Sequence, residues 1–263
     1  MKSGFNMLDV KDLSVEISGK EIIRDITFSA GKSENISLIG TNGAGKTTLL
    51  RALSTLLKYS GSVLANGVEV AVMGERERAK LISFVPQGAE IAGDFDVTHF
   101  LELSRYPYRK PWEKLSTEDK AAIERALELT DTKKFLSRKI GTLSGGERQR
   151  ILIAGAIAQD SEILLLDEPL TYLDPVQRIG ISEIIRKIAA SGKLVITVTH
   201  EINEALVFSE RILALKEGRL VFDGTPSELV KSGELKTLFN SDFLTFGAFD
   251  EGKSLVFPKF DQA

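Results

Sequence analysis

The sequence predicts an α/β fold with a mostly parallel sheet core, an antiparallel β subdomain and an inserted α-helical subdomain. The parallel sheet follows from two apolar runs, residues 162–166 and 193–198, which a helical stretch separates as in a strand–helix–strand unit. The antiparallel part follows from alternating apolar and polar residues near the N-terminus. The helical part follows from residues 88–160, which have helical patterns without a clear strand.

Composition and charge are those of a globular chain with room for one large domain or two smaller ones. Its 263 residues are 43% hydrophobic and 27% charged, and the net charge of −3 indicates no electrostatic footprint for nucleic acid. The lack of cysteine excludes disulfides and thiolate-bound metal. No apolar run reaches the roughly 18–20 residues of a membrane span, and the N-terminus has no apolar signal core. We therefore expect a soluble chain that can dock onto a membrane component, and the lack of cysteine fits a reducing compartment.

Strands and turns account for most of the chain before residue 88. Alternation predicts half-buried strands, and the Asn66-Gly67 pair is a strong hairpin signal between the last two of them. A charged helix and a strand that ends before Gln87 follow. The expected strands are residues 8–10, 13–17, 22–28, 61–65, 68–70 and 81–85, and the charged helix is residues 75–80.

A glycine-rich loop, here called the phosphate loop (residues 40–47), fits the pattern GxxxxGK[ST] between a buried strand and a helix. Such a loop points backbone N–H groups at one anion, and the helix dipole adds positive potential. We expect Lys46 to reach the β- and γ-phosphates and Thr47 to be a Mg²⁺ ligand. The sequence therefore predicts a nucleoside triphosphate site, with candidate binding residues Gly40, Asn42, Gly43, Ala44, Gly45, Lys46, Thr47 and Thr48.

Polar residues follow three predicted strands at the edge where ligands of parallel sheets bind. Asp167 is expected to position Mg²⁺, and Glu168 to orient or deprotonate the attacking water. His200 is expected to contact the γ-phosphate or hold Glu168, and Gln87 to touch the metal or the water. The alternatives are two solvated carboxylates at a strand end and an exposed loop glutamine. The other histidine, His99, is expected to be structural or solvated.

The helical part contains a second anion-binding pattern, here called the serine-glycine loop (residues 143–147). Ser144 is expected to cap a helix that begins Gly145-Gly146-Glu147, as Ser116 to Asp119 form a capping box earlier. Two anion-binding loops in one chain suggest a two-fold dimer, in which each copy's serine-glycine loop closes over the other's nucleotide.

With these motifs in order, the chain resembles ABC-type ATPases from about Met7 to Val230. The motifs are the Walker A loop 40–47, the Q-loop at Gln87, the signature Leu143-Ser144-Gly145-Gly146-Glu147, Walker B 163–168, the D-loop Leu173-Asp174 and the switch His200. The resemblance implies a P-loop NTPase (RecA-like) core that binds ATP and Mg²⁺, with Thr47, Gln87 and Asp167 at the metal. It also implies a homodimer in which Ser144 to Glu147 and Asp174 contribute to nucleotide binding across the interface, and hydrolysis at Glu168.

The domain boundaries expected from this resemblance are an ATPase domain at 7–230 and a tail at 231–263. Within the domain, 7–87 and 161–230 form the core with its antiparallel subdomain, and 88–160 form the helical subdomain. The tail contains Phe243, Phe246, Phe249, Phe257 and Phe260, with a turn expected at 250–253. It is expected to be an ordered hairpin that packs on its own core, the alternative being a dimer or regulatory contact.

Several tracts are similar to the ATPase subunits of importers for iron-siderophores, haem and cobalamin. That subfamily implies a peripheral protein on the inner face of the cell membrane, with permease subunits docking near Gly88–Tyr108, a substrate-binding protein acting indirectly and no nucleic acid. The alternative is a soluble ABC ATPase of DNA repair, ribosomes or iron–sulfur assembly. The tracts are Arg105 to Tyr108, Leu115 to Asp119, Arg148 to Arg150, Ala156 to Gln159 and Leu170 to Asp174.

Two positions depart from the family pattern. Ile17 occupies the place of the aromatic residue that usually stacks on adenine. An aliphatic side chain there still packs against the base but cannot stack on it as a ring does. Phe5 or another aromatic residue is the alternative contact. Thr41 replaces a common proline, which is expected to alter only the stiffness of the loop.

Overall fold

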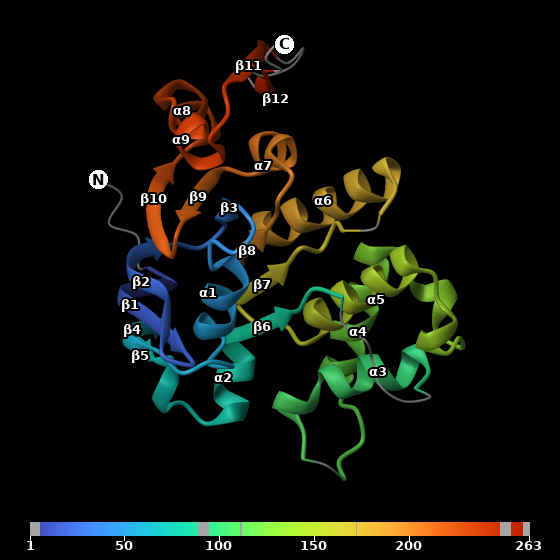
Figure 1. Cartoon of the computed structure of the whole chain (residues 1–263). Helices are drawn as coiled ribbons and strands as arrows, with labels where there is room; N and C mark the ends of the chain where they lie inside the picture. Colours follow the sequence, from blue (N-terminus) through green and yellow to red (C-terminus); the bar gives the residue numbers. More distant parts are fainter. Residues whose placement is uncertain (1–5, 89–94, 111, 172, 248–253, 260–263) are drawn as a thin grey trace.

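The computed structural model describes residues 6–88, 95–110, 112–171, 173–247 and 254–259. A six-stranded sheet in the order β10-β9-β3-β8-β7-β6 forms the centre of the molecule (Figure 1). Five of its strands are parallel and β10 is antiparallel to β9, so the predicted mostly parallel α/β core is confirmed. The strands are β3 (Asn35–Gly40), β6 (Ile82–Val85), β7 (Ile163–Asp167), β8 (Leu194–Val198), β9 (Arg211–Lys216) and β10 (Arg219–Gly224).

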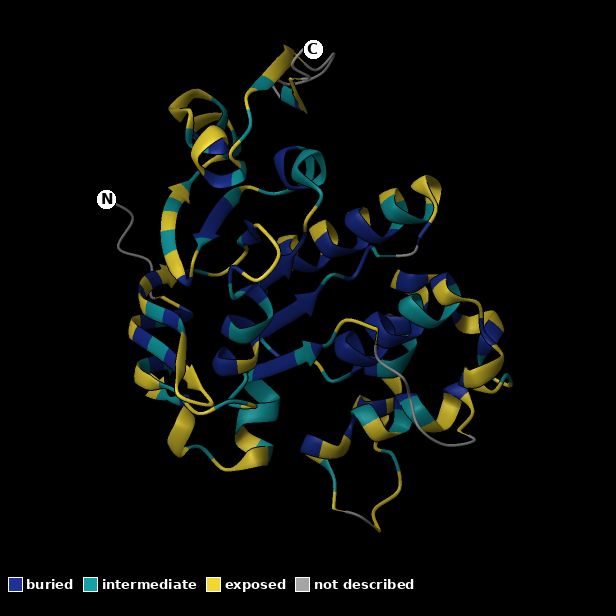
Figure 2. Ribbon diagram, viewed as in Figure 1, coloured by how far each residue is buried: buried dark blue, intermediate teal, exposed yellow. Residues whose placement is uncertain are grey.

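The central strands are apolar throughout because both faces of the sheet are covered (Figure 2). Along β7, Ile163 and Leu165 join a cluster with α1 (Lys46–Leu53), whereas Leu164 and Leu166 face α5 (Gly145–Ala158) and α6 (Pro175–Ala190). Alternate residues of one strand thus bury into two separate cores. This double burial holds the carboxyl ends of the strands in a fixed order.

A second, antiparallel sheet in the order β2-β1-β4-β5 lies beside α1, as the alternation predicts. The two expected strands at 8–10 and 13–17 form one strand, because an irregularity at Asp12 (φ 50°) shifts the register without ending the pairing. The expected strand 68–70 ends at Glu69, because Val70 begins a short 3₁₀ turn. The strands are β1 (Leu8–Ile17), β2 (Lys20–Ala30), β4 (Ser60–Ala65) and β5 (Val68–Glu69).

The helical part contains α3 (Val97–Ser104), α4 (Thr117–Thr130) and α5, with short 3₁₀ turns at Tyr106–Tyr108, Lys133–Phe135 and Ile140–Thr142. A further 3₁₀ turn (Val70–Val72) and α2 (Glu75–Leu81) precede it, between β5 and β6. Both predicted serine caps are present, each as a reciprocal capping box. Buried Arg105 joins three helices at their ends, because it donates to Asp119 Oδ1 (2.8 Å) at the start of α4 and to the Ala158 carbonyl (2.7 Å) at the end of α5. The C-terminal end of α5 is therefore fixed to α3 and α4.

The C-terminal part covers one edge of the central sheet. It contains α7 (Ile202–Phe208), α8 (Pro226–Ser232), α9 (Glu234–Phe239) and the antiparallel pair β11 (Phe243–Gly247) and β12 (Ser254–Pro258). The expected boundary at residue 230 falls inside α8. Buried Val256 contacts the cluster below α7, and the Asn203 side chain forms two hydrogen bonds with the Val256 backbone (3.0 and 2.8 Å). Phe249, Phe260 and the expected turn at 250–253 lie outside the described residues, as do Phe5 and Tyr172.

Candidate functional site

The phosphate loop connects β3 to α1 at the carboxyl edge of the central sheet, and glycine is required at two of its positions. Gly40 has φ 150°, and a Cβ there would lie 2.2 Å from the carbonyl oxygen of Leu215. Gly45 has φ 101°, and a Cβ there would lie 2.6 Å from a methyl group of Ile23. Any larger residue would therefore separate the loop from β9 or β2. The hollow over the loop is lined by Lys20, Ile22, Asn42, Gly43, Ala44, Gly45, Lys46, Thr47, Thr48 and Glu168.

Lys46 is buried and turned back onto its own loop. Its Nζ donates to the carbonyl oxygens of Gly40 (2.8 Å) and Thr41 (3.1 Å). Burial lowers the pKa of Lys46, and the nearby carboxylates Glu168 and Asp167 act in the opposite direction. A cation held by two neutral carbonyls beside a glycine loop is suited to exchange those contacts for phosphate oxygens.

Asp167 is the last residue of β7 and lies opposite the start of α1. Thr47 Oγ1 donates to Asp167 Oδ1 (3.0 Å), while Asp167 Oδ2 is buried and has no hydrogen-bond partner in the described parts of the chain. Burial raises the pKa of Asp167, the Thr47 hydrogen bond lowers it, and the Glu168 charge raises it.

This unsatisfied carboxylate oxygen beside a hydroxyl fits a hard cation such as Mg²⁺. The structure, as far as it is described, has no group of three or more His, Asp or Glu side chains that could hold a metal alone. A cation here would therefore also need oxygen ligands from the nucleotide and water.

Glu168 follows Asp167 in a left-handed conformation (φ 50°), which costs roughly 1–2 kcal/mol for a residue with a Cβ. Its carboxylate oxygen Oε2 meets three side chains. Gln87 Nε2 donates to it at 2.7 Å, Thr171 Oγ1 donates at 3.1 Å, and His200 Nδ1 lies at 3.3 Å. The ends of β6, β7 and β8 thus bring Gln87, Glu168 and His200 together, at the edge where the sequence placed them. Backbone strain concentrated at a convergence of polar groups is typical of functional sites.

Two other expected residues lie apart from this cluster. Ile17 is 41% exposed at the end of β1 and does not line the hollow over the phosphate loop, whereas Lys20 and Ile22 do, within the described chain. His99 is exposed at the start of α3 and stacks on Phe95 at 5.4 Å between ring centroids.

The serine-glycine loop forms the start of α5. The hydroxyl of Ser144 accepts from Glu147 N (3.3 Å), and Glu147 Oε2 accepts from Ser144 N (2.8 Å). The Glu147 side chain is therefore part of the capping box at the start of α5. Gly146 packs so closely on α6 that a Cβ would lie 2.2 Å from the amide oxygen of Gln177. Gly145 lines a different hollow from the phosphate loop, with Gly88, Arg148, Gln149, Leu152, Glu168 and Thr171.

Within the described residues of one copy, no part of Ser144 to Glu147 lines the hollow over the phosphate loop. Asp174 caps α6, its carboxylate accepting from Gln177 N (2.9 Å). Both elements sit on the side of the molecule where α5 and α6 begin (Figure 1).

The sequence did not predict the place of three further residues at the site. Thr171 contacts Glu168, Glu201 contacts His200, and Arg178 reaches the cluster through Glu201. Thr171 lies three positions after Glu168, and that spacing in a turn was the available signal. Glu201 directly follows His200, and that adjacency was the available signal for it. Arg178 had no recognisable signal, because its contact with Glu201 joins positions 23 residues apart.

Comparisons with known proteins give a consistent picture. A family model described as ABC transporter matches residues 23–171. The iron(3+)-hydroxamate import ATP-binding protein of Bacillus subtilis is 34% identical over 90% of this chain and 89% of its own length. The petrobactin import ATP-binding protein FpuC of Bacillus anthracis is 39% identical over 85% of this chain and 83% of its own length. The cobalamin import ATP-binding protein of Halobacterium salinarum is 33% identical over 89% of this chain but only 59% of its own.

Two solved structures are similar in fold. An inward-facing metal-chelate type ABC transporter superimposes with a TM-score of 0.83 at 23% identity, over 97% of this chain and 98% of the other. A dimeric ATP-binding cassette, in a post-hydrolysis state with ADP and phosphate, superimposes with a TM-score of 0.74 at 27% identity, over 84% and 99%.

Proposed function

This chain belongs to the ABC transporter family of ATP-binding proteins, and we propose that it hydrolyses ATP as a homodimer to energise an importer. The observation that carries the proposal is that Gln87 and His200 both contact Oε2 of Glu168, a carboxylate that also lines the hollow over the phosphate loop. A binding module without turnover would have no use for a strained carboxylate at that position.

Phosphate binding would use the backbone of the phosphate loop, the start of α1 and Lys46. In this step the Lys46 ammonium exchanges the Gly40 and Thr41 carbonyls for β- and γ-phosphate oxygens. Thr47 and Asp167, with Gln87 nearby, would hold Mg²⁺, and bound Mg²⁺ would neutralise charge on the phosphates. Asp167 supplies its unsatisfied oxygen for this purpose.

Hydrolysis would use Glu168 and His200. The oxygen of a water forms a bond to the γ-phosphorus, the bond from that phosphorus to the bridging oxygen breaks, and Glu168 accepts a proton from the water. In the structure, Glu168 Oε2 is already engaged by Gln87, Thr171 and His200. We propose that His200 and Gln87 hold this carboxylate in place until nucleotide and water arrive, and that His200 then contacts the γ-phosphate.

The nucleotide site would be completed by a second copy of the chain. Ser144, Gly145 and Gly146 at the start of α5 would face the partner's γ-phosphate, with Asp174 near the same interface. This proposal is supported by the absence of these residues from the hollow over their own phosphate loop, as far as the chain is described. It is also supported by the dimeric state of a similar cassette that holds ADP and phosphate. Ile17, with Lys20 and Ile22, is proposed to lie near adenine.

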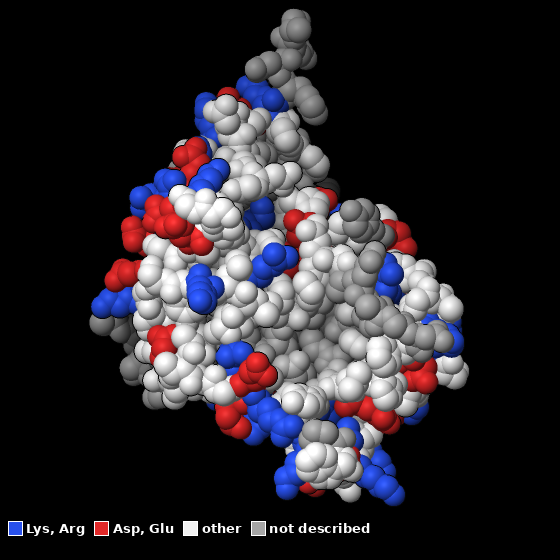
Figure 3. Space-filling model, turned by 60° about the horizontal axis from the view of Figure 1, so that its bottom comes forward, with Lys and Arg blue, Asp and Glu red and all other residues white. Residues whose placement is uncertain are grey.

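The transport role follows the relatives, whose names include iron(3+)-hydroxamate, petrobactin and cobalamin import. We propose an iron-siderophore, haem or cobalamin importer at the inner face of the membrane, with a substrate-binding protein acting indirectly. None of the described helices is long and apolar enough to cross a membrane. On the face shown in Figure 3, acidic and basic side chains are interspersed, which supports a protein partner over nucleic acid.

The permease would dock near Gly88–Tyr108, of which residues 89–94 lie outside the described structure. The described part exposes Leu103, Tyr106 and Tyr108 close together in sequence. Exposed apolar side chains gathered on one segment are typical of a protein contact. We propose that 88–160 act as the helical unit that moves with the permease and 7–87 with 161–230 as the nucleotide-binding unit.

The test is a pull-down of the tagged chain from its native membranes in mild detergent, with partners identified by mass spectrometry. A polytopic permease is expected, and its recovery should fall for Leu103→Lys but not for Leu129→Lys, which changes another exposed leucine. Recovery of soluble partners, ribosomes or DNA alone would contradict the transport role.

A further inference from the structure

The side chain of Arg178 connects two segments of the site that are far apart in sequence. Arg178 lies in the first turn of α6, and helical side chains lean toward the N-terminus of their helix. Its Nε donates to the carbonyl of Leu173 (3.0 Å), while Nη1 donates to Glu201 (3.3 Å) and Glu204 (3.4 Å). One guanidinium therefore joins residues 173–174 to the segment that begins α7.

The same contacts reach His200 through Glu201. Glu201 Oε1 accepts from Arg178 and also lies 3.6 Å from His200 Nε2, an electrostatic contact longer than a hydrogen bond. The other ring nitrogen, Nδ1, lies 3.3 Å from Glu168 Oε2. The imidazole is thus placed between two carboxylates, and a change in its orientation would lose both contacts. The backbone next to it is held by a hydrogen bond from Glu201 N to Thr199 Oγ1 (3.0 Å).

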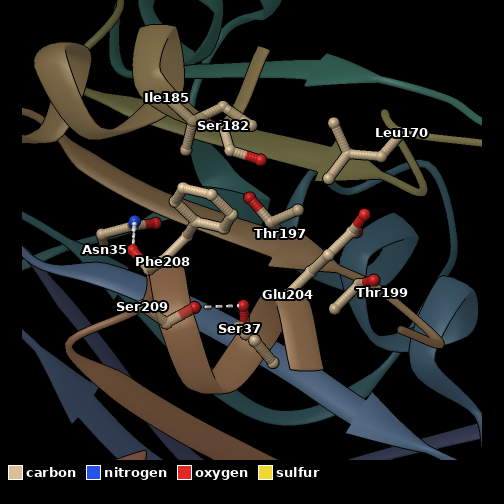
Figure 4. Close-up of a pocket in the computed structure, with 11 residues that line it drawn as sticks. Asn35, Ser37, Leu170, Ser182, Ile185, Thr197, Thr199, Glu204, Phe208 and Ser209 are labelled. Atoms are coloured by element: carbon tan, nitrogen blue, oxygen red, sulfur yellow. Dashed lines mark hydrogen bonds between the residues drawn. The ribbon is translucent and has the colours of Figure 1, made fainter. Parts of the chain in front are cut away.

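Arg178 also neutralises a pair of acidic side chains that would otherwise repel each other. Glu204 Oε1 faces Arg178, but Oε2 is buried without a hydrogen-bond partner in the described structure. Figure 4 shows Glu204 and Thr197 among the residues that line the cavity between α6 and α7. Burial raises the pKa of Glu204, the charge of Arg178 lowers it, and the charge of Glu201 raises it. Without the guanidinium, Glu201 and Glu204 lose their shared cation. The repulsion between the two carboxylates would then favour a displacement of the first turn of α7.

We infer that Arg178 is a positioning residue that orients His200 toward Glu168 through Glu201 and makes this orientation depend on residues 173–174 through the Leu173 carbonyl. The inference rests on the proposed function, in which Asp174 lies where the two copies meet. A displacement of residues 173–174 when the copies close would be passed to His200 through three side-chain contacts.

The test is steady-state ATP hydrolysis by Arg178→Met, with Arg186→Met as the matched control because Arg186 is exposed on the same helix. We expect Arg178→Met to lower kcat about tenfold, a part of the 10²–10⁴-fold that a positioned acid or base contributes. The KM for ATP should stay within about threefold, since the phosphate loop is unchanged. Arg178→Lys should recover part of the loss, because it keeps the charge but cannot span all three acceptors.

A double-mutant cycle with Glu201→Gln separates positioning from general damage. If Arg178 acts through Glu201, the double variant should be no slower than the slower single variant. Losses that multiply, a kcat for Arg178→Met equal to that of Arg186→Met, or an effect on KM alone would each overturn the inference. Should Arg178→Met fail to fold, Arg178→Lys and Glu201→Gln carry the same test. If the unaltered chain shows no ATP hydrolysis that Glu168→Gln removes, the proposed function itself has failed.

Discussion

Replacing Lys46 by methionine tests the phosphate loop, because it removes the ammonium and keeps most of the side-chain volume. Lys46 Nζ has two contacts in the nucleotide-free protein, at 2.8 and 3.1 Å, and both are neutral carbonyls. Exchanging them for phosphate oxygens adds charge–charge hydrogen bonding, worth about 1.5–3 kcal/mol. At 1.4 kcal/mol per factor of ten, the loss in affinity is about 10- to 140-fold.

The assay is calorimetric titration with Mg²⁺ and a non-hydrolysable ATP analogue, which excludes turnover. Lys193→Met is the control, because Lys193 lies just before the start of β8, at the opposite edge of the sheet from the phosphate loop. Its Nζ donates to Asp160 (2.9 Å). The thermal unfolding temperature of both variants should stay near that of the unaltered chain. A Lys46→Met variant that binds within twofold of the original would refute the proposed exchange of carbonyls for phosphates.

Glu168→Gln should lower kcat for ATP at least about 100-fold with nucleotide binding within a few-fold, as measured by phosphate release and titration; normal turnover would remove Glu168 from the role of base. Asp119→Asn should destabilise the fold by about 3–5 kcal/mol, because it leaves Arg105 buried and unpaired. Burial alone would raise the pKa of Asp119, but hydrogen bonds from Arg105 and Ser116 outweigh it and the pKa is lowered. The difference in unfolding temperature from the original should therefore persist above about pH 4 and shrink as the pH falls below it, and a constant difference would contradict the ion pair. Asn203→Leu should speed hydrogen exchange at the Val256 amide, because the acceptor of that amide is lost, whereas Leu244→Ala should not. Equal exchange in both variants would contradict the hydrogen bonds between Asn203 and Val256.

Much of the fold could be predicted because its signals are local. Alternation of apolar residues marks half-buried strands, unbroken apolar runs mark strands covered on both faces, and the two serine caps mark helix starts. The meeting of Gln87, Glu168 and His200 could also be predicted, because parallel strands end at a common edge. The continuity of β1 could not, since a residue at φ 50° interrupts the alternation without ending the pairing.

The details of the site depend on packing between distant segments. The left-handed conformation of Glu168 has no sequence signal, because the residue is a glutamate rather than a glycine. The contacts of Arg178 require α6 and α7 to lie side by side, which no periodicity specifies. The unsatisfied oxygen of Asp167 likewise appears only once β7 and α1 are packed together.

The central claim, that each ATP is bound between two copies of the chain, is tested most directly by cross-linking the phosphate loop of one copy to the serine-glycine loop of the other. The sequence contains no cysteine, so Asn42→Cys and Ser144→Cys in the Glu168→Gln background provide the only thiols of the chain, and a two-fold dimer pairs the thiol at position 42 of each copy with the thiol at position 144 of its partner. A short bismaleimide is added to native membranes with and without ATP. We predict an ATP-dependent covalent dimer of twice 28.8 kDa that Lys46→Met abolishes. Cross-linking within single chains, or dimers formed equally without ATP, would contradict the shared site.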